Sequence, residues 1–70
     1  NVTCVEKALL FFSLTSVLIV ELINSAIENT IDRIGLENNE LSGRAKDMGA
    51  AAVMLTIFMM MGIWLCVLLY

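Results

Sequence analysis

The longest run without a charged side chain, Met48–Tyr70, limits what this chain can fold into more than any other feature. It contains 23 residues and as a helix would be about 34 Å long. That is enough to cross a bilayer core of roughly 30 Å with some tilt. The 70-residue chain is 60% hydrophobic, with a mean hydropathy of +0.91. A soluble chain this short buries only a modest core, so the composition favours lipid as the surroundings.

A second uncharged run, Ala8–Val20, predicts another helix that extends beyond the run at both ends. Thr3 and Glu6 have the spacing of a capping box, and Gly35 suits the position just after a helix end. We therefore expect helices over about 3–34 and 45–70, joined by a connection over about 35–44. The whole chain, 1–70, reads as one domain of an all-α membrane protein, a two-helix transmembrane hairpin. Ser42 or Asn39 is the expected cap of the second helix.

Charge and small residues predict how the hairpin is oriented and packed. Arg33, Arg44 and Lys46 flank the connection and only Lys7 lies at the other side, so the positive-inside rule puts the connection in the cytoplasm. Small residues near the start of the second helix suit close contact with another helix or a ligand: Gly43, Ala45, Gly49, Ala50, Ala51 and Ala52.

The basic residues, histidine and cysteine argue against nucleic-acid binding and against a zinc site. The net charge is −3 and no basic cluster has interleaved aromatics, so we expect no nucleic-acid partner. There is no His, and Cys4 and Cys66 are isolated, so we expect no zinc site. The two cysteines are expected to be packing residues, with a disulfide as the alternative. Trp64 and Tyr70 suit an interfacial aromatic belt, with a deeper packing position as the alternative for Trp64.

A stripe of polar side chains marks the candidate site. At 100° per residue, Glu28 lies about 20° from Glu21, Asp32 about 20° to the other side, and Asn24 about 60° away. Ionisable groups at membrane depth are expensive and indicate function by default. A hairpin alone has little interior to shield Glu21 and Glu28, so we expect oligomerisation to a helical bundle.

These carboxylates lie close to the cations of the connection, a combination that suits a metal–nucleotide complex. Magnesium is bound by one or two carboxylates together with substrate phosphates, and Lys neutralises phosphate as a point charge. No Walker-type phosphate loop is present. The alternative is that Asp32 and Arg33, and with them Glu28, form only the solvated end of a helix. Acidic residues in a loop, such as Glu37 and Glu40, more often keep the loop soluble than bind a ligand.

Two long stretches then carry a resemblance to a known family. The pattern ExxNxxxExxxDRIG from Glu21 to Gly35, followed by ELSGRAKDMGAAAV from Glu40 to Val53, strongly resembles the prokaryotic diacylglycerol kinase family. The form of both stretches is more similar to the diacylglycerol enzymes than to the undecaprenol kinases of the same family. The resemblance implies a homotrimer in the bacterial inner membrane, with three transmembrane helices per subunit and active sites shared between subunits.

The resemblance also implies roles for single residues. The reaction would transfer the γ-phosphoryl group of ATP to the hydroxyl of diacylglycerol, giving phosphatidic acid. Glu21 corresponds to the general base, Asn24 to the same catalytic core, and Glu28 to a magnesium ligand at the nucleotide. Further nucleotide contacts fall on Glu37, Asn38, Asn39, Lys46 and Asp47. Lipid contacts fall on Ala50, Trp64, Leu65, Cys66, Val67, Leu68 and Leu69.

The chain departs from the family pattern in two respects. The family's surface helix and first membrane helix, with a second magnesium carboxylate, have no counterpart here, so we expect the C-terminal part of a longer kinase. Asn38-Asn39 replaces the Tyr-His of many relatives. Rival readings are an ion-translocating hairpin, whose carboxylate would lie in the middle of the second helix, and a purely structural hairpin.

Overall fold

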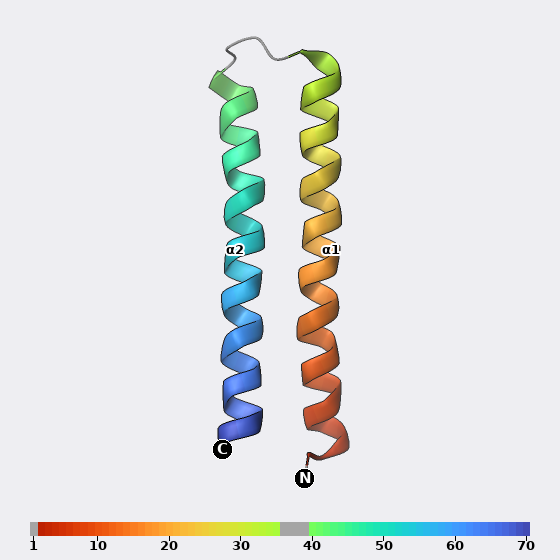
Figure 1. Ribbon diagram of the computed structural model, residues 1–70, viewed down its shortest axis with the longest axis vertical. Helices are drawn as coiled ribbons and strands as arrows, with labels where there is room; N and C mark the ends of the chain where they lie inside the picture. The colour runs from red at the N-terminus through yellow and green to blue at the C-terminus, as the bar shows by residue number, and fades with distance from the viewer. Residues whose placement is uncertain (1, 36–39) are drawn as a thin grey trace.

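The chain forms an antiparallel pair of helices in a computed structural model that describes residues 2–35 and 40–70. Helix α1 spans Cys4–Ile34 and helix α2 spans Glu40–Leu69. They lie side by side, with the connection at one end and both termini at the other (Figure 1). Both helices are long and apolar enough to cross a membrane. The described residues contain no strand, and the prediction of an all-α hairpin is confirmed.

Both ends of α1 follow from local sequence. The Thr3 hydroxyl accepts the Glu6 N–H at 3.1 Å, and the Glu6 carboxylate accepts the Thr3 N–H at 2.8 Å. This confirms the capping box and satisfies two N–H groups that the helix leaves open. At the other end Gly35 adopts φ 144° and donates its N–H to the Ile31 carbonyl at 3.1 Å. Only glycine takes that backbone conformation without strain.

Helix α2 begins earlier than the sequence pattern predicted. Residues 40–44 were expected in the connection and are helical instead. Glu40 lies in the first turn, where a negative charge interacts favourably with the helix dipole. Its carboxylate lies 3.6 Å from the guanidinium of Arg44, one turn further along the helix. Ser42 lies inside the helix rather than at its cap. The other predicted cap, Asn39, lies outside the described residues.

The two helices meet along a seam in which the less exposed residues recur at alternating steps of three and four. On α1 this seam contains Leu10, Ser13, Val17, Val20, Asn24, Ile27 and Ile31. On α2 it contains Lys46, Gly49, Val53, Thr56, Met60, Ile63 and Val67. A repeat of 3.5 residues is the spacing of left-handed coiled-coil packing. The seam therefore fixes which side chains of one helix face the other.

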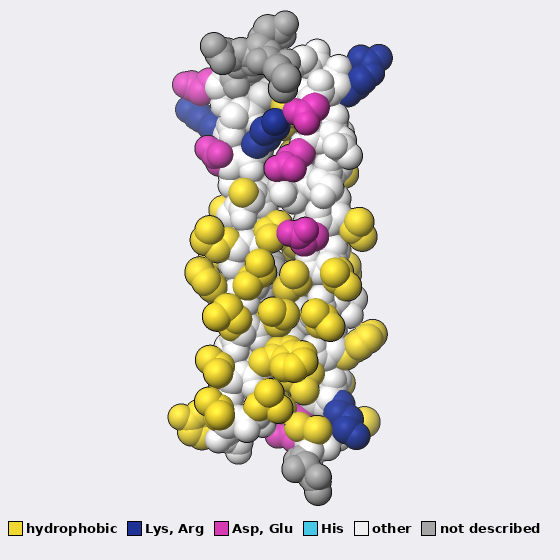
Figure 2. Space-filling model, in the orientation of Figure 1, with side chains coloured by type: hydrophobic (Ala, Val, Ile, Leu, Met, Phe, Trp, Pro, Cys, Tyr) yellow, Lys and Arg dark blue, Asp and Glu magenta, His cyan; other side chains and the backbone are white. Residues whose placement is uncertain are grey.

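The hairpin keeps most of its apolar surface on the outside. Among the described residues no hydrophobic side chain is buried, whereas Ser13 and Gly49 are. Phe11 and Leu22, by contrast, are each 72% exposed. Figure 2 shows hydrophobic side chains over the middle and lower part of one face, with the charged groups concentrated toward the connection. An all-round apolar exterior of this kind suits lipid or further helices rather than water.

Candidate active site

The acidic stripe of α1 lies along one flank of the helix seam. Taking Asn24 in the seam as zero, Glu28 lies about 40° round the helix, Glu21 about 60° and Asp32 about 80°, all to the same side. Glu28 is half-buried, whereas Glu21 and Asp32 are exposed. Acidic side chains extend along one face from the connection down into the hydrophobic zone (Figure 2). The stripe thus borders the contact between the helices, and we call this border the acidic edge.

A cation from α2 meets the acidic edge. The Lys46 ammonium lies 2.9 Å from the Asp32 carboxylate, and the two side chains are 36% and 51% exposed. Lys46 precedes Gly49 by three residues, which turns it about 60° from Gly49 toward this edge of the seam. An exposed ion pair adds little stability. Its significance is position, because an ammonium has three donors and the Asp32 bond uses one of them.

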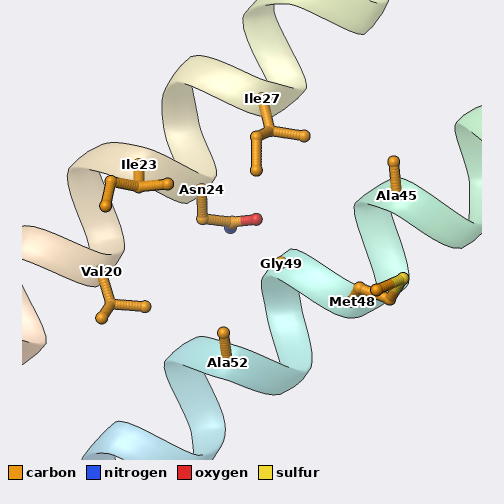
Figure 3. A pocket seen from close by; sticks show the side chains of 8 residues that line it. All are labelled: Val20, Ile23, Asn24, Ile27, Ala45, Met48, Gly49 and Ala52. Atoms are coloured by element: carbon orange, nitrogen blue, oxygen red, sulfur yellow. The ribbon is translucent and has the colours of Figure 1, made fainter.

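Asn24 occupies the seam opposite Gly49. A Cβ placed on Gly49 would collide with the Asn24 side-chain oxygen, so only glycine leaves room for the carboxamide. That oxygen is buried and has no hydrogen-bond partner among the described residues. In Figure 3 the Asn24 carboxamide points across the gap between the helices toward Gly49. The small residue predicted to allow close approach therefore accommodates a polar side chain.

The flank opposite the acidic edge is hollowed and apolar. A groove of about 310 Å³ lies between the helices, and Asn24 is its one polar side chain. Its other lining residues are Val20, Ile23, Ile27, Ala45, Met48, Gly49 and Ala52 (Figure 3). Ala45 and Ala52 thus lie near α1 as expected of small residues. Gly43, in contrast, has open space at its Cβ position.

The remaining predicted site residues do not all lie on the same side of the hairpin. Lys46 and Ala50 turn toward the acidic edge, and Trp64 and Leu68 lie further down the same side of α2, by helical geometry at about 60–100° from the seam. Asp47 is exposed and points about 160° away from the seam. Glu37, Asn38 and Asn39 lie outside the described residues.

The rest of the predicted lipid-contact segment lies at the end of α2 that is nearest to the two chain termini. Val67 faces the seam and is half-buried, whereas Leu65, Cys66 and Leu69 are exposed. Cys66 and Cys4 are both free thiols. A hollow of about 300 Å³ on this part of α2 is lined by Met61, Trp64, Leu65, Leu68 and Leu69.

Three contacts at or near the site were not predicted. The sequence did not decide whether Asp32 is functional or only solvated at the helix end. In the structure it pairs with Lys46. Gly49 was expected only to allow close approach, and it faces Asn24. Ser13 was not singled out, yet its hydroxyl accepts a hydrogen bond from the Trp64 indole at 3.1 Å. A polar or small residue at a seam position is the signal shared by Ser13, Asn24 and Gly49.

The fold and the acidic edge together define an all-α membrane protein of the helical-hairpin type, with charged groups at the end of its membrane-length helices. More specifically, the chain belongs to the prokaryotic diacylglycerol kinase family, whose sequence model, Prokaryotic diacylglycerol kinase, matches residues 1–68. The resemblance noted from the two motif stretches is therefore confirmed.

Individual relatives agree with this assignment. The diacylglycerol kinase of Escherichia coli (strain K12) is 51% identical over 70 residues, which is all of this chain and 57% of the relative. That of Pseudomonas aeruginosa is 47% identical over 64 residues, 91% of this chain and 52% of the relative. That of Haemophilus influenzae is 45% identical over 62 residues, which is 89% of this chain and 52% of the relative. The chain thus spans little more than half the length of the curated relatives it matches.

Proposed function

We propose that this chain carries part of the active site of a diacylglycerol kinase, which transfers the γ-phosphoryl group of ATP to the lipid hydroxyl and yields phosphatidic acid. Family membership supports the proposal, and so do the relatives' names. The observation that carries it is the acidic edge, which runs from the apolar zone of α1 to the point where Lys46 meets Asp32. A lipid alcohol stays in the bilayer and a nucleotide arrives from water, so the reaction needs charged groups at that boundary.

The donor set on the acidic edge fits a magnesium ion. Glu28 is half-buried beside the seam, with the exposed Glu21 two turns before it on the same flank. Mg²⁺ takes hard oxygen ligands, with one or two protein carboxylates completed by substrate phosphates and water. Glu28 would hold the ion, in keeping with the role its position implies in the family. Bound there, Mg²⁺ would supply neutralisation of the charge on the phosphates.

The protein's own residues divide the work of the transfer. Glu21 accepts the proton of the lipid hydroxyl as the hydroxyl oxygen bonds to the γ-phosphorus, and the bond from that phosphorus to the bridging oxygen breaks, releasing ADP. Lys46 binds the phosphates through its remaining N–H donors. Asn24 lies three and four residues from Glu21 and Glu28, so its carboxamide is a neighbour of both. Its place against Gly49 keeps it there.

The same proposal extends to substrates, surroundings and assembly. The nucleotide would also contact Asp47 and the segment 37–39, and the lipid would contact Ala50 and the segment 64–69. We propose the bacterial inner membrane, with the connection in the cytoplasm, as the positions of Arg33, Arg44 and Lys46 favour. Exposed Glu21 beside the apolar zone needs cover from further helices, which a homotrimer with shared sites would provide.

A direct assay tests the proposal. The full-length gene product is reconstituted in phosphatidylcholine vesicles with Mg²⁺, γ-labelled ATP and either diacylglycerol or undecaprenol. We expect label in phosphatidic acid and little in undecaprenyl phosphate. Preferential labelling of undecaprenol would assign the protein to the other activity considered. Ion flux through the vesicles without label transfer to either lipid would overturn the kinase proposal.

A further inference from the structure

A part-buried polar contact joins Ser13 of α1 to Trp64 of α2. The indole N–H of Trp64 donates to the Ser13 hydroxyl oxygen at 3.1 Å. The same hydroxyl donates to the Leu10 carbonyl at 2.8 Å. Ser13 is completely buried, with 0% exposure. One small side chain thus accepts one hydrogen bond and donates another, at a seam position where an apolar residue would be expected.

This contact lies far from the chemistry proposed above. Ser13 precedes Glu21 by eight residues, which is about 12 Å along the helix axis. Trp64 follows Lys46 by 18 residues, about 27 Å along α2. Neither residue can reach the phosphates from there. A direct effect of the pair on the reaction must therefore act through the lipid.

Trp64 also forms part of the hollow on α2. The hollow has a volume of about 300 Å³, and Met61, Leu65, Leu68 and Leu69 line it together with the indole. Trp64 is 37% exposed, less than Leu65 at 55% and Leu68 at 62%. Its ring is thus held between α1 and this apolar surface.

A tryptophan in a membrane normally directs its N–H toward the polar interface. Here the N–H is directed the other way, into the seam, where Ser13 satisfies it. Without the Ser13 oxygen the part-buried N–H would lose its partner, and turning the ring outward to the interface would become favourable. The hydroxyl of Ser13 therefore determines which way the indole faces.

We propose that Ser13 is a positioning residue that holds the Trp64 indole in the wall of the α2 hollow, where it packs against an acyl chain of the lipid substrate. This inference rests on the proposed kinase function. Ser13 does not touch the lipid; it acts only by orienting the ring. Its loss should affect lipid use and leave nucleotide use unchanged.

The test uses the full-length protein in lipid vesicles and the variants Ser13→Ala and Trp64→Phe, the second of which keeps an aromatic ring but removes the N–H. Ser16→Ala is the matched control, because the Ser16 hydroxyl donates to the Phe12 carbonyl of its own helix at 2.8 Å. We expect both test variants to raise KM for diacylglycerol about fivefold, the size of one neutral hydrogen bond. KM for ATP should be unchanged in all three.

Two further readouts separate orientation from loss of structure. The Trp64 indole N–H proton resonance, assigned by its absence in Trp64→Phe, should move upfield in Ser13→Ala and stay in place in Ser16→Ala. The double variant Ser13→Ala/Trp64→Phe should have the same KM for diacylglycerol as Trp64→Phe alone, because without the indole N–H the Ser13 hydroxyl has no ring to orient.

The outcomes distinguish this inference from the proposed function. If the unsubstituted protein phosphorylates diacylglycerol but Ser13→Ala leaves its KM for that lipid unchanged, positioning by Ser13 is wrong and the kinase function stands. Additive effects in the double variant, or an equal rise in KM for ATP, would also overturn it. If the unsubstituted protein transfers no label, the proposed function fails and this inference fails with it.

Discussion

The carboxamide of Asn24 lies against the backbone of Gly49, at a place where a Cβ on residue 49 would collide with the amide oxygen. The two residues come from different helices, and each depends on the other. Gly49 provides the space, and Asn24 fills it with a polar group between Glu21 and Glu28 on the same helix. The position of the acidic edge relative to α2 therefore depends on residue 49 having no side-chain methyl group.

Gly49→Ala tests this coupling. We expect lower kinase activity and a loss of about 1–3 kcal/mol in unfolding free energy, the usual effect of overpacking a close contact, although alanine is the better helix former. Activity and thermal unfolding in detergent measure the two effects. Gly62→Ala is the control, because the Cβ position of Gly62 is open. Equal behaviour of the two variants would contradict the importance of the contact.

Glu21→Gln separates chemistry from binding. If Glu21 accepts the proton of the lipid hydroxyl, the variant should lose turnover by roughly 10²–10⁴-fold, the range for a general base. Nucleotide binding should survive, as measured by a fluorescent ATP analogue. Full phosphorylation of diacylglycerol by the variant would remove Glu21 from the mechanism.

Glu28→Gln addresses the metal. Turnover should fall by about 100-fold or more, the size found for loss of one preorganised electrostatic group, and half-maximal activity should need more Mg²⁺. A magnesium titration of the activity measures both. Glu6→Gln in the same helix is the control, since glutamine still serves in the Thr3 capping box. An unchanged magnesium requirement in Glu28→Gln would assign the ion elsewhere.

The Asp32–Lys46 pair permits a double-mutant cycle. Lys46→Met should lower kcat/KM for ATP by about 100-fold, because a phosphate-binding charge is lost. Asp32→Asn should cost less, and nothing more once Lys46 is replaced, because Asp32 acts by holding the ammonium. Steady-state kinetics of the four proteins give the coupling.

An equal loss from Asp32→Asn in both backgrounds would show that Asp32 has a role independent of Lys46. Glu40→Gln serves as the control for ion-pair loss in general, since it removes the exposed Glu40–Arg44 pair within α2. It should leave kcat/KM for ATP unchanged.

Much of the hairpin was predictable because its determinants are local. The uncharged runs, the Thr3–Glu6 capping box and the glycine after Ile34 each act within one helix. The acidic stripe was predictable for the same reason, since it depends only on the helical period. The start of α2 was not predicted because its signal, one acidic residue in the first turn, is weak in the sequence.

The contacts between helices were beyond the reach of such patterns. Trp64 could be assigned to the interface or to a neighbour from its position alone, and only the pairing with Ser13 decides between them. Likewise, the period of α1 gives no information on which residue of α2 faces Asn24. That requires the relative height of the two helices, which the segment between them and the packing determine together.

The two polar contacts of the seam have a joint consequence for that relative height. Ser13–Trp64 and Asn24–Gly49 lie about 16 Å apart along α1 and are separated by apolar side chains that would pack almost equally well if one helix slid by a turn. A slide would strand the indole N–H and push the carboxamide of Asn24 against a side chain. A single polar residue in a coiled-coil seam is enough to select one register. With two, the hairpin has one alignment in which both fit, and the proposed catalytic and lipid-binding groups are held at constant depths.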